Sequence, residues 1–162
     1  MRRAVFRARF GLGVLLGLAF ALLPACKTKE PEARWVRAEI GAGNDQLLMD
    51  VTALSFQKCG FPVGSGIDPG HLVAVSGWHT SLQPFRGKGW REKCEVRYRK
   101  LGPRKYEAQI RVMREKNDDI VHPLNLTYAQ WIPDEDDTVR ARSVMQHVRS
   151  LLGTDVEIGE KR

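Results

Sequence analysis

The sequence has few of the residues that build metal and redox centres. Its 162 residues include three cysteines and four histidines, and neither a CxxC nor an HxxxH spacing occurs. Structural zinc sites depend on such closely spaced ligand pairs. A zinc site that combines Cys59 and Cys94 with His71 and His79 is therefore disfavoured. We expect no metal and no cofactor.

Motifs that bind phosphates or activate nucleophiles are also missing. The sequence contains no GxxxxGK[ST] and no GxGxxG, which are the loops that hold nucleotide phosphates. Ser76-Gly77 lacks the neighbours of a nucleophile elbow. The acidic run at residues 134–137 has no glycine-bearing calcium loop around it, so it is expected to be the solvated start of a helix. We therefore expect no enzymatic activity.

Acidic residues are missing from the start of the chain. No Asp or Glu precedes Glu30, and the formal net charge of the whole chain is +7. Residues 1–25 hold four of the 26 basic residues and none of the 19 acidic ones, so without them the charge falls to +3. The basic whole-chain balance is thus no sign of nucleic-acid binding. The 43% hydrophobic and 28% charged content is typical of one soluble globular domain.

A hydrophobic run long enough to cross a membrane is absent too. The uncharged stretch at residues 11–25 has 15 residues, whereas a spanning helix needs roughly 20. Arginines precede it and small residues end it. This order is typical of a secretory signal, which we assign to residues 1–25.

The signal ends at Leu23-Pro24-Ala25-Cys26. This stretch resembles the lipobox of bacterial lipoproteins, in which a leucine and two small residues precede a cysteine. The resemblance implies a diacylglycerol on the Cys26 thiol, cleavage before that residue and acylation of the new amino terminus. Two or more acyl chains hold a protein stably on a bilayer. The alternative is an ordinary secreted protein with Cys26 as a free thiol.

Lys27 follows the cysteine where lipoproteins retained at the inner membrane often carry aspartate. By this resemblance, we expect an outer-membrane anchor with the domain in the periplasm. Residues 26–34 are charged and contain proline, so they are predicted to be a tether. Residues 35–153 then form a single domain, and residues 154–162 form a tail.

The two remaining cysteines are Cys59 and Cys94. Export places them in an oxidising compartment, where an even number of otherwise unassigned cysteines indicates a disulfide. The alternative is two separate buried thiols, because cysteine is a good small core residue.

Two segments have the apolar spacing of amphipathic helices. The first is capped by Asn44 or Asp45 and ends at Gly60. The second runs from the acidic residues 134–137 to Gly153. The expected buried positions are Leu47, Leu48, Val51, Leu54 and Cys59 in the first, and Ala141, Val144, Met145, Val148, Leu151 and Leu152 in the second.

Extended segments are predicted at residues 34–40, with Trp35 as a buried anchor, at 71–79 and at 124–132. The strongest hairpin spans residues 90–117 and turns at Gly102-Pro103, with Tyr98 placed opposite Tyr106 and Val96 opposite Ala108. The fold class is therefore α+β. We expect a two-layer sandwich in which an antiparallel meander of 3–4 strands carries two amphipathic helices on one face.

One pattern joins the first helix to the following strand: Leu54, Cys59-Gly60-Phe61-Pro62-Val63, Asp68-Pro69-Gly70 and Val73-Ala74-Val75. It resembles the helix-grip domains of BamC-type outer-membrane assembly lipoproteins. The element order over residues 45–115 is similar to that of the LPS-assembly lipoprotein LptE. This resemblance implies an architecture, and a partner only by analogy.

Residues 86–116 hold twelve basic and four acidic residues. Arg97, Arg99 and Arg111 are expected on the outward face of the hairpin, where they would meet lipid A phosphates, anionic headgroups or an acidic partner protein. The alternative is a solvated sheet face with no ligand. The sequence thus predicts a non-enzymatic, lipid-anchored envelope lipoprotein that acts as a scaffold or accessory binding component at the outer membrane. The second hypothesis is a module that binds lipid A, LPS or anionic lipid.

Overall fold

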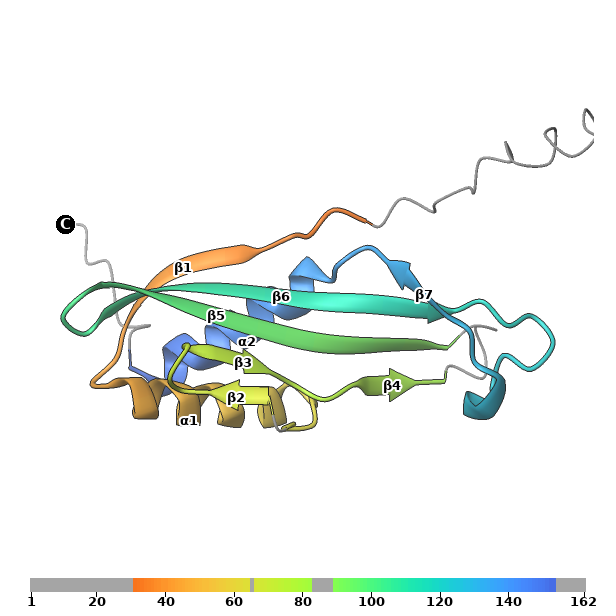
Figure 1. Ribbon diagram of the computed structural model, residues 1–162, viewed down its shortest axis with the longest axis horizontal. Helices are drawn as coiled ribbons and strands as arrows, with labels where there is room; N and C mark the ends of the chain where they lie inside the picture. Colours follow the sequence, from red (N-terminus) through yellow and green to blue (C-terminus); the bar gives the residue numbers. More distant parts are fainter. Residues whose placement is uncertain (1–30, 65, 83–88, 154–162) are drawn as a thin grey trace, which may run out of the picture.

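The computed structural model describes residues 31–64, 66–82 and 89–153. The predicted signal peptide, Cys26, the first part of the predicted tether and the tail at residues 154–162 lie outside the described residues. The described chain is α+β, with two α-helices and an antiparallel sheet of seven strands (Figure 1).

The strand order is β1-β6-β5-β3-β2, with β4 also paired to β5 and β7 also paired to β6. The sheet has more strands than the 3–4 predicted, and its order is not that of a meander, because β1 pairs with β6. The short strand β3 lies within the predicted segment 71–79, whereas β2 was missed. Strands of three or four residues are too brief for a period-two pattern to be recognised. The strands are β1 (Val36–Gly41), β2 (Gly66–Asp68), β3 (Val73–Val75), β4 (His79–Ser81), β5 (Trp90–Gly102), β6 (Lys105–Asn117) and β7 (Trp131–Asp134).

The hairpin of β5 and β6 forms as predicted, but its register differs. Tyr98 lies opposite Ala108 rather than Tyr106, because the ladder has an irregularity between Lys100 and Gly102 before the turn. The turn leaves Arg104 at a positive φ of 58°. The shift is an even number of residues, so every side chain keeps the face that its alternation assigned to it.

The first helix, α1 (Asp45–Lys58), is capped by Asn44, whose side chain accepts a hydrogen bond from the Leu47 amide. Its buried face differs from the predicted one, because Leu47 and Leu54 are 44% and 48% exposed. Two polar residues lie inward instead. The hydroxyl of Thr52 bonds to the hydroxyl of Tyr98 at 2.6 Å, and Ser55 donates to a helix carbonyl. The buried side chains are Leu48, Met49, Val51, Thr52, Ser55 and Phe56.

The second helix, α2 (Thr138–Leu151), is capped by the side chain of Asp137. Ala141, Val144, Met145 and Val148 are buried, as the spacing predicts, whereas Leu151 is exposed. The strand predicted at residues 124–132 is wrong over most of its length. That segment contains a 3₁₀ turn, Leu126–Tyr128, and pairing starts only with β7.

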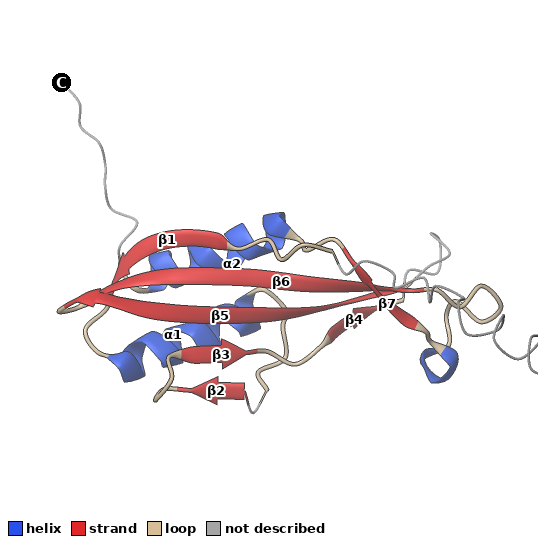
Figure 2. Cartoon of the chain, turned by 45° about the horizontal axis from the view of Figure 1, so that its top comes forward, coloured by secondary structure: helices blue, strands red, loops and turns tan. Residues whose placement is uncertain are grey.

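Both helices lie against one face of the sheet (Figure 2). This covered face carries the inward residues of β5 and β6, which are Cys94, Val96, Tyr98, Tyr106, Ala108, Ile110 and Val112. We call the opposite side the open face. Trp35 is not the predicted buried anchor, since it is only half-buried and its ring lies 4.8 Å from the Arg97 guanidinium. Within the described residues, neither helix is long and apolar enough to cross a membrane.

Candidate functional site

Cations stack on tryptophans along the open face. The guanidinium of Arg91 lies 4.3 Å from the ring centre of Trp78 and 4.8 Å from that of Trp131. The ammonium of Lys93 also lies over Trp78, at 4.8 Å. Such cation–π contacts hold the charge in place and cover the apolar ring. Sequence reasoning missed this group, because its rings come from segments far apart in the chain.

The three predicted arginines differ in their surroundings. Arg97 lies 2.6 Å from Glu95, and Arg99 lies 2.9 Å from Glu107. The side chains of both arginines are more than half exposed. The open face therefore carries paired charges rather than a purely basic surface.

Arg111 occupies a more enclosed position. Its Nε donates to Asp136 at 2.6 Å and its Nη2 donates at 3.2 Å, and only 21% of its side chain is exposed. The backbone amide of Arg34 donates to the same carboxylate at 2.8 Å. This pair thus fastens the segment before β1 to the segment before α2, which is a structural role.

An ion-pair cluster that the sequence analysis missed lies under the helices. Glu92 is 1% exposed, and its carboxylate lies 2.8 Å from Arg140 and 3.6 Å from Arg114. Burial raises the pKa of Glu92, against the opposing effect of the Arg140 charge. The guanidinium of Arg140 lies 4.6 Å over the Phe61 ring. One signal was present in the sequence, because Glu92 shares the alternation phase of Cys94 and Val96.

Cys94 is fully buried and Cys59 is half-buried. Both are free thiols in the structure, in place of the predicted disulfide. Burial raises the pKa of each thiol, and the neighbouring Cys59 raises that of Cys94 further. Raised pKa values reduce the thiolate fraction and hence the reactivity of both residues.

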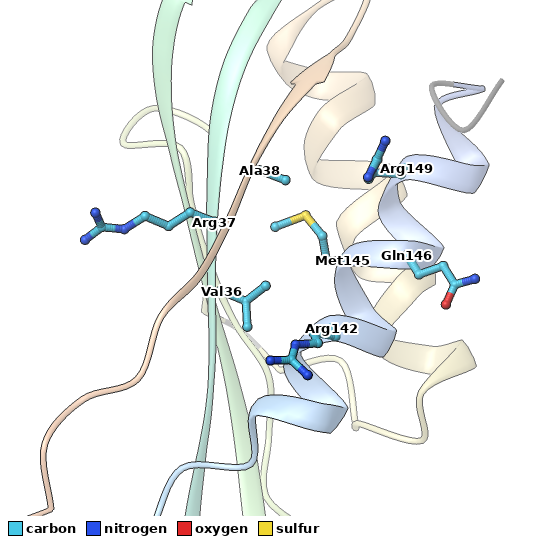
Figure 3. A pocket seen from close by; sticks show the side chains of 7 residues that line it. All are labelled: Val36, Arg37, Ala38, Arg142, Met145, Gln146 and Arg149. Atoms are coloured by element: carbon cyan, nitrogen blue, oxygen red, sulfur yellow. The ribbon is translucent and has the colours of Figure 1, made fainter. Parts of the chain in front are cut away.

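A groove of about 600 Å³ runs between β1 and α2. Figure 3 shows Val36 and Ala38 of β1 and Met145 of α2 pointing into it, while Arg37 points away. Two further arginines of α2, Arg142 and Arg149, and the amide of Gln146 complete the lining. β1 is an edge strand of the sheet. An edge strand has unpaired backbone groups, so this groove combines an apolar floor, positive charge and a hydrogen-bonding strand.

The four histidines lie apart in the fold. His71 bonds to Asp68, His79 packs beside Trp90, and His122 stacks on Tyr128 with ring centres 4.6 Å apart. In the described part of the chain, no group of three His, Cys, Asp or Glu side chains is placed to hold a metal ion.

Comparison with known proteins does not assign the chain to a family. No protein-family model matches the chain, and no curated protein is similar enough in sequence to count as a relative.

Proposed function

We propose that this chain is a non-enzymatic envelope lipoprotein, anchored through acyl chains on Cys26 at the outer membrane and exposing its domain to the periplasm as a scaffold for another envelope protein. The observation that carries the proposal is the Leu23-Pro24-Ala25-Cys26 stretch after an apolar leader, five residues before the described domain begins. Multiple acyl chains make such an anchor stable.

The groove between β1 and α2 is the surface that best supports the scaffold role. Its occupant is an extended segment of a partner protein that alternates apolar and acidic residues. An added strand would pair with the free edge of β1 and place its apolar side chains over Val36, Ala38 and Met145. Acidic side chains would meet Arg142, so charge complementarity favours such a segment.

The alternative function, binding of lipid A or anionic lipid by the open face, has support from Lys93, whose ammonium lies over the Trp78 ring. It has less support from the arginines, because Arg91, Arg97 and Arg99 already hold the carboxylates of Glu115, Glu95 and Glu107. Charge reversal at Lys93, Arg97 and Arg99 together would abolish salt-sensitive binding to anionic liposomes if this function operated. Unchanged binding would remove the alternative.

The anchor is tested by intact-mass analysis of the native protein and by its recovery in the membrane fraction. We expect a mass that lacks residues 1–25 and includes added acyl groups, and we expect Cys26→Ala to shift the protein out of the membrane fraction. A chain that keeps its leader, or is cleaved without acylation, contradicts the proposal.

The groove is tested by a photo-cross-linking amino acid at Gln146, with the same substitution at the exposed Gln57 of α1 as the control. We expect protein adducts in native membranes from position 146 and not from position 57. Arg142→Glu should reduce these adducts, because it places a negative charge beside an acidic segment. Equal adducts from both positions, or adducts unaffected by Arg142→Glu, contradict this binding mode.

A further inference from the structure

Exposed apolar side chains are concentrated in one loop of the molecule. Residues 118–130 connect β6 to β7, and we call them the apolar loop. Of the eleven large hydrophobic residues that are exposed in the described chain, five lie in this loop. They are Ile120 at 81%, Val121 at 77%, Leu124 at 45%, Leu126 at 54% and Tyr128 at 55% exposure. Single exposed hydrophobic residues are ordinary, but a contiguous group marks a contact surface.

Internal hydrogen bonds give the apolar loop a defined shape. The amide of Asp118 donates to the carbonyl of Gln130 at 2.8 Å and so closes the loop at its neck. The fully buried Asn117 accepts from the amides of Asp119 and Gln130 and donates to the carbonyl of Pro123. Polar groups are thus satisfied inside the loop, while its aliphatic side chains point outward.

Asp119 is one of the internal acceptors. Its carboxylate accepts from the amides of Val121 and His122 at 2.8 and 2.9 Å. Hydrogen bonds from the His122 backbone lower the pKa of Asp119. The acidic groups of the apolar loop, Asp118 and Asp119, therefore lie at its neck, and residues 120–128 contain no acidic side chain.

The described chain starts in the half of the molecule that carries the apolar loop, above β6 and inward of the loop itself (Figure 1). Pro31 shares a hollow of about 280 Å³ with Pro133 and Asp134 of β7, the strand that follows the loop. Cys26 is five residues before Pro31, and five residues span at most roughly 18 Å. Acyl chains on Cys26 would therefore hold the half of the domain that carries the apolar loop close to the bilayer.

Aromatic and basic side chains are present beside the neck. Trp131 begins β7, and Arg91 lies between its ring and that of Trp78, with Lys93 also over Trp78. Tryptophan rings favour the headgroup level of a membrane, and nearby cations are attracted to anionic headgroups. The apolar loop would lie among the acyl chains, and the tryptophans and cations beside it would lie at the level of the headgroups.

We propose that the apolar loop inserts residues 120–128 into the surface of the bilayer that holds Cys26, as a second and orienting membrane contact. The proposal rests on the lipid anchor proposed above. The loop would fix the long hairpin upright, with the turn at Leu101 pointing away from the lipid. The open face and the groove beside β1 would then be presented at a constant angle to partners.

The test places a nitroxide label on Val121→Cys in the full native chain, reconstituted in phosphatidylethanolamine–phosphatidylglycerol vesicles. Leu101→Cys is the matched control, because Leu101 is an exposed aliphatic residue at the opposite end of the same two strands. Label uptake by the unsubstituted chain measures the contribution of Cys59. We expect the label at position 121 to relax faster with oxygen than with a water-soluble nickel chelate, and the label at position 101 to show the reverse.

Three outcomes separate this inference from the anchor. If intact mass confirms acylation but both labels are equally accessible to nickel, the apolar loop does not contact lipid and the anchor stands. If position 121 becomes shielded only in native envelope membranes, the loop contacts a protein and the inference is overturned. If acyl groups are missing from the mass, the proposed anchor fails on its own measurement, and the label at position 121 still reports whether the loop enters the vesicle surface.

In a second variant, Ile120→Ser with Val121→Ser, the loop keeps its internal bonds, so lost orientation there cannot be ascribed to unfolding.

Discussion

The two faces of the sheet use the same chemistry in different surroundings. On the covered face, Glu92 meets Arg140 with its carboxylate 1% exposed. On the open face, Arg97 and Arg99 meet glutamates while more than half of each arginine side chain remains exposed. Water screens the second kind of pair, whereas removal of one partner from the first kind leaves an uncompensated buried charge. The position of a pair, rather than its existence, decides what it contributes.

The largest effect is expected from Glu92→Ala. The substitution leaves Arg140 without its carboxylate under the helices and removes a fully buried side chain, so the free energy of unfolding should fall by about 3–5 kcal/mol. Chemical denaturation measures the loss. Arg97→Ala on the open face is the control and should change the value by less than about 1 kcal/mol. Equal losses in the two variants would refute the contrast between the faces.

Oxidation of the core thiols should have the next largest effect. Export predicts a disulfide between Cys59 and Cys94, and closing a loop of about 35 residues would stabilise the fold by roughly 3–4 kcal/mol in the chain-entropy model. If the exported protein forms this bond, in contrast to the free thiols of the structure, protein isolated without reductant loses this amount when reductant is added. If both thiols react with an alkylating reagent as soon as the isolated chain is unfolded, the free thiols of the structure represent the exported protein, and the disulfide prediction is wrong.

An intermediate effect is expected from Arg111→Ala. Its guanidinium gives Asp136 two hydrogen bonds in a half-buried position, so the loss should be about 1–3 kcal/mol. Thermal unfolding of Arg111→Ala and Arg99→Ala compares an enclosed and an exposed arginine on the same face of the sheet. A loss no larger than that of Arg99→Ala would place Arg111 among the exposed pairs, and it would again be available to a ligand.

The sequence predicted what depends on local patterns. Alternation assigned the inward residues of β5 and β6 correctly, and helical spacing did so for most of α2. The sequence-based predictions failed where tertiary contacts determine which side chains are buried. The buried face of α1 includes Thr52 because its hydroxyl forms a hydrogen bond with the hydroxyl of Tyr98 across the core. The segment at residues 124–130 forms a loop because Asn117 donates to the Pro123 carbonyl and accepts from the Gln130 amide.

Long-range packing also explains what the sequence missed in the candidate sites. Trp78 and Trp131 bracket Arg91 only because β4 and β7 pair with opposite strands of the central hairpin. The groove needs β1 and α2 side by side, although more than a hundred residues separate Val36 from Met145. No local pattern contains that information.

The smallest expected effect is the pH dependence of the unfolding free energy, which should have opposite signs on the two faces. Burial raises the pKa of Glu92 on the covered face, whereas hydrogen bonds from Gln109 and Arg99 lower the pKa of Glu107 on the open face. A raised folded-state pKa makes stability fall as pH rises above the ordinary glutamate value and through the raised one. A lowered pKa makes stability fall as pH drops below the ordinary value.

Glu92→Gln and Glu107→Gln should therefore change the dependence of unfolding free energy on pH in opposite directions. Glu92→Gln should remove a decline on the alkaline side of the ordinary glutamate pKa, and Glu107→Gln should remove a decline on its acid side. Urea denaturation from pH 3 to pH 8 measures both slopes. Slopes of the same sign would mean that the arginines around Glu92 outweigh its burial, so that the covered carboxylate is held charged like those on the open face.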